Sequence, residues 1–173
     1  GHDEERPPLY FEEREKDVPP MAEQGLRPDE ITIAELLRAR GYRTLGLGKW
    51  HLGEAAPMQP AAQGFDEYLG FLPGGSLYLP LDHPDSVESV QDFDPIDAFL
   101  WANLPFAVSK DGGQRFEPSA YMTDYLADEA VKAIEANANR PFFLYLAFNA
   151  PHTPLQALRS DSDALAGIES HAL

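Results

Sequence analysis

Lys49 and His51 stand two residues apart at the end of a short, glycine-rich apolar run within Gly41–Gly53 (GYRTLGLGKWHLG). Such a run is typical of a short buried strand, and in open α/β sheets ligands bind just past the carboxyl ends of the strands. An ammonium group suits a tetrahedral oxyanion, and an imidazole that titrates near neutral pH can move a proton. The pair therefore favours an anionic substrate such as a sulfate or phosphate ester.

A second histidine follows a second apolar run. Phe142–Phe148 (FFLYLAF) has the continuous apolar character expected of a central parallel strand that is covered on both faces. The polar loop after it, Asn149–Pro154 (NAPHTP), contains His152. If both strands belong to one parallel sheet, their loops open on the same edge, and His152 lies near Lys49 and His51. A single histidine after a strand is more often structural than catalytic, but the coincidence of three such residues favours a site.

Helical patterns precede both strands. Thr32–Glu35 has the spacing of a capping box, and Gly41 stands where a helix C-terminal glycine belongs. Ser119–Asn137 carries apolar residues four positions apart, and Pro141 ends this helix. Helix followed by strand, twice, predicts an α/β fold with a mixed, mostly parallel sheet flanked by helices. Residues 161–173 are expected to begin a further helix.

Residues 54–118 show little periodicity, and we expect them to form an insertion that shapes the rim of a pocket. Within this range, Asp111–Gly113 (DGG) predicts a hairpin turn between strands at 106–110 and 114–117. The acidic run from Asp82 to Asp97 lacks the ligand spacing of a calcium loop, and its Asp-His pair lacks further metal ligands, so a solvated rim is the favoured interpretation.

Three aromatic residues in the same region, Tyr68, Phe71 and Tyr78, are interleaved with glycines. Aromatic rings in such a context line a subsite for a sugar or aryl group in some proteins. In others they form a small satellite core, because aromatic side chains bury large apolar areas. The sequence leaves both interpretations open.

The composition restricts the class of protein. The chain has 173 residues, of which 29 are acidic and 13 basic, for a formal net charge of −16. This balance argues against nucleic-acid binding, which needs a basic surface. There is no cysteine, and no apolar run approaches the length of a membrane span. Residues 1–29 are charged and rich in proline, which indicates either a surface segment laid over a domain or a flexible lead-in.

Two segments of the sequence resemble a known family. Gly41–Gly53 is similar to the second signature of the type I sulfatases, and Pro141–Pro154 resembles a second conserved block of the same family. The matching regions, 32–70 and 141–155, cover about a third of the chain and occur in the family's order. The resemblance implies the α/β alkaline-phosphatase-like fold and the hydrolysis of a sulfate ester.

The resemblance also implies roles for individual residues. Lys49 matches the lysine that binds the sulfate oxygens. His51 matches the histidine that contacts the nucleophilic diol and helps it to expel sulfate, and His152 matches the one that binds the ester and assists the leaving oxygen. Trp50 occupies the aromatic position of the motif, and we expect it to pack beneath the loop.

This sequence departs from the family pattern in its nucleophile and metal ligands. The family uses a formylglycine made from Cys or Ser in a C/S-x-P/A-x-R motif, together with Ca²⁺ held by paired aspartates and a later Asp-Asn pair. No cysteine is present, no serine opens such a motif, and neither calcium motif is found. We therefore interpret residues 1–173 as the central part of one sulfatase catalytic domain, with no metal ligands of its own, and expect this chain alone to be inactive.

Two other functions remain open. A phosphonate or phosphate monoester hydrolase on the same fold would need a similar anion site, and a non-catalytic domain could bind sulfated ligands. For a sulfatase, the expected substrate is a small-molecule sulfate ester, such as an aryl sulfate, or a carbohydrate sulfate. Family members are often exported, so the resemblance is compatible with a periplasmic or secreted protein.

Overall fold

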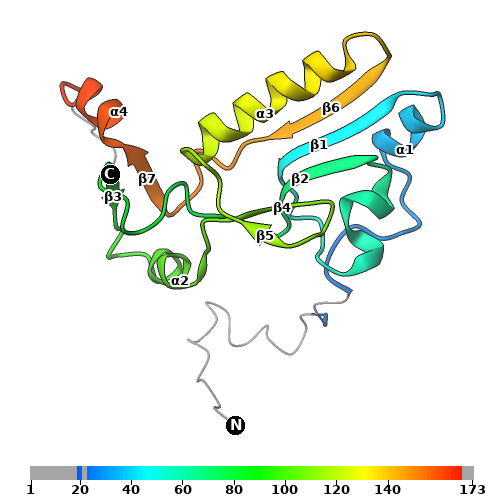
Figure 1. The fold of residues 1–173 in the computed structure, drawn as a ribbon. Coiled ribbons are helices and arrows are strands. Elements are labelled where there is room, and N and C mark those ends of the chain that lie inside the picture. The colour runs from blue at the N-terminus through cyan, green and yellow to red at the C-terminus, as the bar shows by residue number, and fades with distance from the viewer. Residues whose placement is uncertain (1–18, 21–22, 169–173) are drawn as a thin grey trace.

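The computed structural model describes residues 19–20 and 23–168 and contains a five-stranded sheet in the order β5-β4-β2-β1-β6 (Figure 1). β1 pairs in parallel with β2 and β6, and these two pairs contain most of the paired residues, whereas β4 and β5 are antiparallel. The predicted mixed, mostly parallel sheet is therefore confirmed. The strands are β1 (Arg43–Lys49), β2 (Glu67–Phe71), β4 (Val108–Lys110), β5 (Arg115–Phe116) and β6 (Phe142–Ala147).

Glycines allow the three parallel strands to approach one another closely near their carboxyl ends. Gly48 has φ 95°, and a Cβ at this position would overlap the carbonyl oxygen of Ala147 in β6. A Cβ on Gly70 of β2 would overlap the carbonyl oxygen of Gly48. The hydroxyl of Tyr68 donates a hydrogen bond to this same carbonyl. A larger residue at either glycine would separate the strands, so the glycine-rich run is a requirement of the sheet.

Helices cover both faces of the sheet. On one face, α1 (Ile33–Arg38) contributes Ala34 to a buried cluster that includes Tyr68. On the other face, α3 (Met122–Asn137) packs over a second cluster that includes Phe71. Successive side chains of a strand point to opposite faces, so positions 68 and 71 of β2 belong to different cores. α1 begins with the predicted capping box.

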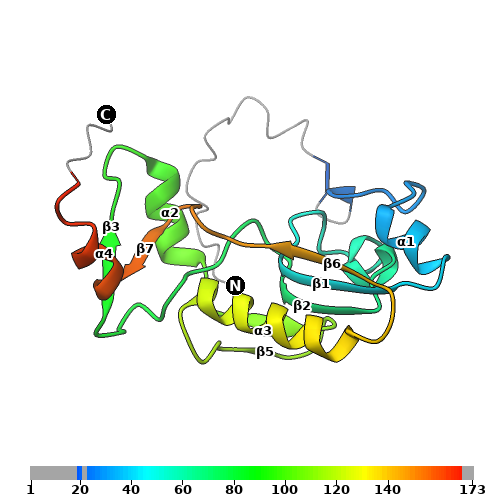
Figure 2. The same cartoon turned by 90° about the horizontal axis from the view of Figure 1, so that it is seen from above.

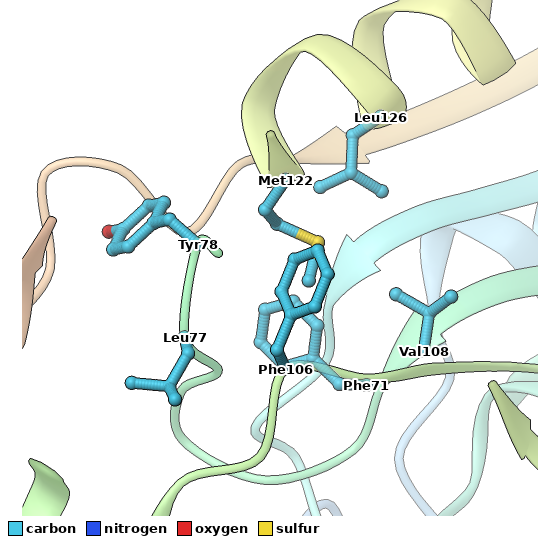
Figure 3. Packing of buried hydrophobic residues seen from close by; sticks show 7 residues of the cluster. All are labelled: Phe71, Leu77, Tyr78, Phe106, Val108, Met122 and Leu126. Carbon is cyan, nitrogen blue, oxygen red and sulfur yellow. The ribbon is translucent and has the colours of Figure 1, made fainter. Parts of the chain in front are cut away.

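The larger cluster lies beneath the first turns of α3 (Figure 3). Met122 and Leu126 of this helix are completely buried. Tyr78 approaches the cluster from a neighbouring segment, with its hydroxyl directed away from the other side chains (Figure 3). All three aromatics for which the sequence left two interpretations open are buried, which favours the core interpretation. The cluster is completed by Phe71, Leu77, Phe106 and Val108.

A smaller unit lies beyond the carboxyl end of β6 (Figures 1 and 2). Within it, β3 pairs with β7 in antiparallel orientation, and α4 packs against both strands. Neither strand is predicted from the sequence, because their pairing joins segments that are far apart in the chain. The unit consists of β3 (Ser86–Ser89), α2 (Pro95–Asn103), β7 (Leu155–Leu158) and α4 (Arg159–Ala164).

Two expectations need correction. β6 is parallel and has packed side chains on both faces, but it forms an edge of the sheet among the described residues rather than a central strand. An apolar run indicates that both faces of a strand are covered by other side chains. It does not show that the strand has a hydrogen-bonded neighbour on each side.

Helix α2, which was not predicted, begins within the acidic run. Its signal was present in Asp94, whose carboxylate caps the amide of Ile96, and in Pro95 at the first helical position.

The predicted hairpin at Asp111–Gly113 is confirmed, and it joins β4 to β5. The carboxylate of Asp111 accepts a hydrogen bond from the amide of Tyr68 at 2.7 Å, which ties the hairpin to β2. Residues 54–118 thus supply three strands of the sheet, and a pocket-rim role for the rest of this range stays a prediction. No helix among the described residues is long and apolar enough to cross a membrane.

The structure tests only part of what the sequence predicts for the two ends of the chain. Most of the proline-rich segment 1–29 lies outside the described residues, but the amide of Leu26 donates to the carbonyl of Leu52 at 2.8 Å. This part therefore lies against the loop after β1. The tail helix begins at Arg159, slightly earlier than expected, and residues 169–173 lie outside the described range.

The packing of α3 on the sheet can be tested at Leu126. Leu126→Ala should lower the free energy of unfolding by about 2–5 kcal/mol, because it removes a fully buried side chain and leaves a cavity. Val131→Ala on the same helix is the control, since Val131 is 53% exposed and should change stability by less than about 0.5 kcal/mol. Urea denaturation followed by circular dichroism measures both. Equal effects of the two substitutions would contradict the packing described.

Candidate active site

The predicted site residues meet at one edge of the sheet. Lys49 is the last residue of β1, and it stands opposite Phe71, the last residue of β2. Ala147 ends β6 and stands opposite Gly48, so the loop that carries His152 leaves the sheet beside the loop that carries His51. The expectation that both loops open on the same edge is therefore confirmed.

His51 is held in an unusual backbone conformation directly after β1. Its φ is 56°, in the left-handed region that residues other than glycine adopt rarely, and such conformations concentrate at functional sites. Its amide donates to the carbonyl of Leu72 at 3.0 Å, which continues the pairing of β1 with β2 by two residues. The imidazole lies against Gly74, where an added Cβ would stand 2.8 Å from Nε2.

His152 is fixed through its own loop. Its amide donates to the carbonyl of Asn149 at 2.9 Å, and its carbonyl accepts from the hydroxyl of Tyr78 at 2.8 Å. Ring nitrogen Nδ1 lies within hydrogen-bond distance of the carbonyl of Thr153, and a carbonyl can only accept. Nδ1 is therefore assigned as the protonated nitrogen, which leaves Nε2 as the acceptor nitrogen of the ring.

His51 is influenced electrostatically by the two other residues. The pKa of His51 is lowered from its ordinary value, first by partial burial against the Gly74 turn and then by the positive charges of Lys49 and His152. Burial also lowers the pKa of Lys49. Among the described residues, no carboxylate lies within ion-pair distance of Lys49. The arrangement is a small cationic site in a strongly acidic chain, and its positive charge is available to an anion.

A buried turn separates the two histidines. Gly74 contacts the ring of His51, and a Cβ on Gly75 would lie 3.7 Å from Nδ1 of His152. The next residue, Ser76, is completely buried, and its carbonyl accepts from the side-chain amide of Asn149 at 2.8 Å. Sequence reasoning missed Gly74 and Asn149, although the Gly-Gly pair and a polar residue directly after the apolar strand were visible signals.

Trp50 packs beneath the site as expected. It is 4% exposed, and its indole N–H donates to the carbonyl of Met58 at 2.9 Å. Its ring meets Phe65 edge-to-face with a centroid separation of 5.8 Å. These contacts fix the chain between Lys49 and His51, so Trp50 supports the loop without reaching a ligand.

The described residues do not provide a calcium site. Nowhere in 19–20 or 23–168 do three or more His, Asp or Glu side chains gather in a position to hold a metal ion. The Asp82-His83 pair serves its own turn, where Nδ1 of His83 accepts from the amide of Asp85 at 3.2 Å. The aspartates of the acidic run are mostly exposed, in agreement with a solvated rim.

Comparison with known proteins places the chain in a family. A family model described as Sulfatase matches residues 6–166. The chain belongs to the sulfatase family. This result confirms the resemblance that rests on the Lys49–His51 motif and on the loop of His152.

Two mouse relatives show how much of a sulfatase this chain represents. N-acetylgalactosamine-6-sulfatase is 30% identical over 139 residues, which cover 78% of this chain and 25% of the relative. Arylsulfatase G is 32% identical over 143 residues, which cover 76% of this chain and 27% of the relative. The chain therefore spans about a quarter of the length of these curated relatives.

A solved structure confirms the fold class. The crystal structure of Ps i-CgsB in complex with k-i-k-neocarrahexaose is 36% identical in sequence and matches with a TM-score of 0.67. The match covers 85% of this chain and 32% of the other. Together with the mixed sheet and its flanking helices, this likeness identifies the alkaline-phosphatase-like fold of the sulfatases, of which the chain forms a part.

The contact between Gly74 and His51 gives a first test of the site. Gly74→Ala should displace the imidazole of His51, because the added methyl would lie 2.8 Å from Nε2 while the backbone itself needs no positive φ. The Cε1 proton resonance of His51, observed by NMR, should therefore move from its position in the unsubstituted protein. Gly167→Ala, which meets nothing within 4 Å, is the control and should leave this resonance unchanged. An unchanged His51 resonance in Gly74→Ala would contradict the contact.

The charge coupling gives a second test. The ring of His51 should titrate with a midpoint below 6.5, because burial and two nearby cations disfavour its protonated form. Lys49→Gln should raise this midpoint by removing one of the cations, so that His51 binds its proton at higher pH. The Cε1 proton resonance of His51, followed by NMR against pH, measures both values. An identical midpoint in the variant would show that the Lys49 ammonium does not act on His51.

Proposed function

We propose that the protein containing this chain hydrolyses a carbohydrate sulfate ester to an alcohol and inorganic sulfate. The observation that carries the proposal is the meeting of Lys49, His51 and His152 at one sheet edge, where the two other cationic residues lower the pKa of His51. In the reaction the ester S–O bond breaks, water supplies the new oxygen of sulfate, and the leaving alkoxide takes up a proton.

Lys49 and His51 act on the sulfate side of this reaction. The ammonium of Lys49 has no carboxylate partner among the described residues, so it binds the sulfate oxygens and stabilises their charge. His51 has a lowered pKa, so it is neutral at physiological pH and accepts a proton from the group that attacks or expels sulfate.

His152 acts on the leaving-group side. Because Nδ1–H donates to the carbonyl of Thr153, Nε2 is the nitrogen that binds the ester. In the imidazolium form Nε2 carries the second proton, which it gives to the leaving oxygen, and His152 returns to the neutral form. The backbone contacts of this residue to Asn149 and Tyr78 keep the ring in place, and such support is needed for efficient proton transfer.

A carbohydrate substrate is supported by two relatives. One is named N-acetylgalactosamine-6-sulfatase, and the solved structure with a TM-score of 0.67 was obtained with k-i-k-neocarrahexaose. The nucleophile and the calcium that the family resemblance implies have no counterpart in the described residues, so this chain contributes anion binding and proton transfer. The 173-residue chain alone is therefore inactive under this proposal.

The proposal predicts a defined loss of activity. In the full-length protein, Lys49→Ala, His51→Ala and His152→Ala should each reduce sulfate release at least about 100-fold, because each removes charge stabilisation or proton transfer. Ion chromatography of sulfate released from sulfated disaccharides measures the effect. His83→Ala is the control, since His83 lies in the turn before β3 and has no role in the proposed chemistry.

The same assay separates the alternatives. A phosphate or phosphonate monoester hydrolase would release its product faster from the matching phosphate or phosphonate ester than from any sulfate ester. A binding domain without catalysis would bind sulfated disaccharides but release no sulfate. Measurable turnover by the isolated 173-residue chain, abolished by His51→Ala, would contradict the proposal that this chain supplies only anion binding and proton transfer.

A further inference from the structure

An open cleft of about 530 Å³ is lined by His152, by the smaller unit and by the residue before α3. Tyr78 and Tyr121 form part of its wall, and Glu88 and Asp161 contribute to it from β3 and α4. The remaining lining residues are Val87, Ser89, Ala150, Pro151, Leu155, Gln156, Ala157, Ser162, Leu165 and Ala166.

Part of the cleft wall is formed by two uncharged aromatic side chains. The rings of Tyr78 and Tyr121 are stacked, with centroids 5.6 Å apart. Both hydroxyls are used by the backbone, since they donate to the carbonyls of His152 and Gln156. Burial raises the pKa of both tyrosines, which keeps them uncharged. Tyr78 is almost completely buried against Tyr121, so Tyr121 is the ring that a ligand can contact. Because the hydroxyl of Tyr121 is occupied, this residue offers mainly ring carbon.

The remaining charges of the cleft are negative. Glu88 and Asp161 are exposed side chains that line it, and neither forms an ion pair within the part of the chain that the structure describes. The described residues that line the cleft include no lysine or arginine. Carboxylates accept hydrogen bonds from hydroxyl groups, but they repel a sulfate or a uronate. The cleft thus has the opposite charge preference from the site around Lys49.

We propose that this cleft binds an uncharged sugar ring on the leaving-group side of the sulfate ester, and that Glu88 and Asp161 exclude a second anionic group from it. The inference rests on the proposed function and adds the substrate class. Because His152 lines the cleft, the cleft receives the part of the substrate that the leaving oxygen carries. Apolar walls with a few hydrogen-bonding groups suit a sugar, whose carbon-bound face and hydroxyls differ in polarity.

The test compares disaccharides that differ by one sulfate. The probes are the monosulfated and disulfated disaccharides of carrageenan and of chondroitin, with 4-nitrophenyl sulfate as an ester that lacks a sugar. The full-length protein should hydrolyse members whose leaving-group ring carries no second charge with a higher kcat/KM than the disulfated members. The double variant Glu88→Gln/Asp161→Asn should raise the ratio of disulfated to monosulfated kcat/KM about tenfold, because it removes two nearby like charges.

A second double variant controls for net charge. Asp128→Asn/Glu135→Gln removes the same two charges from exposed positions on α3 and should leave the ratio of disulfated to monosulfated kcat/KM unchanged. An equal change in both double variants, or no change in either, would overturn the subsite. Turnover of 4-nitrophenyl sulfate alone would also overturn it, in favour of an aryl leaving group. Release of sulfate from none of the probes would instead reject the proposed function, and the subsite with it.

Discussion

The close approach of three backbones near Gly48 is the constraint on which the rest of the structure depends. β1 can lie between β2 and β6 in parallel register only because Gly48 and Gly70 carry no side chain at the points of contact. The register brings the ends of all three strands to one edge, and the loops that follow inherit their positions from it. Lys49 and His51 are thus placed by the backbone of the sheet, and the Gly74 turn fits between the loops because it too lacks side chains.

Local features were predictable from the sequence because their causes are local. The capping box at Thr32, the helix before Pro141 and the Asp111 hairpin depend on a few neighbouring residues, and all three are present. The placement of Lys49, His51 and His152 at one edge of the sheet was also predictable, since lysine and histidine directly after apolar runs indicate a site at strand ends. Recognition of the family added the roles of these residues, which composition and spacing alone did not supply.

Features that depend on distant parts of the chain were not predictable in this way. β3 and β7 pair across about 70 residues, and neither segment shows an alternating pattern of its own. The edge position of β6 depends on which strands are neighbours, whereas its sequence reports only how its faces are covered. The contact of Gly74 with His51 depends on a turn that no motif specifies. The apolar character of the cleft next to His152 likewise arises from segments that meet only in the folded molecule.

The pairing of β1 with β6 has a consequence for how this region folds. Arg43 stands opposite Phe142, so the contact closes a chain segment of about 100 residues. The chain loses conformational entropy when so long a segment closes, and this loss comes before the favourable contacts form. Topologies of this kind therefore fold slowly. His51 and His152 come from the two ends of that segment. The two histidines therefore come together only when the sheet is complete. A folding intermediate that contains only the local hairpin and helices would have no anion site.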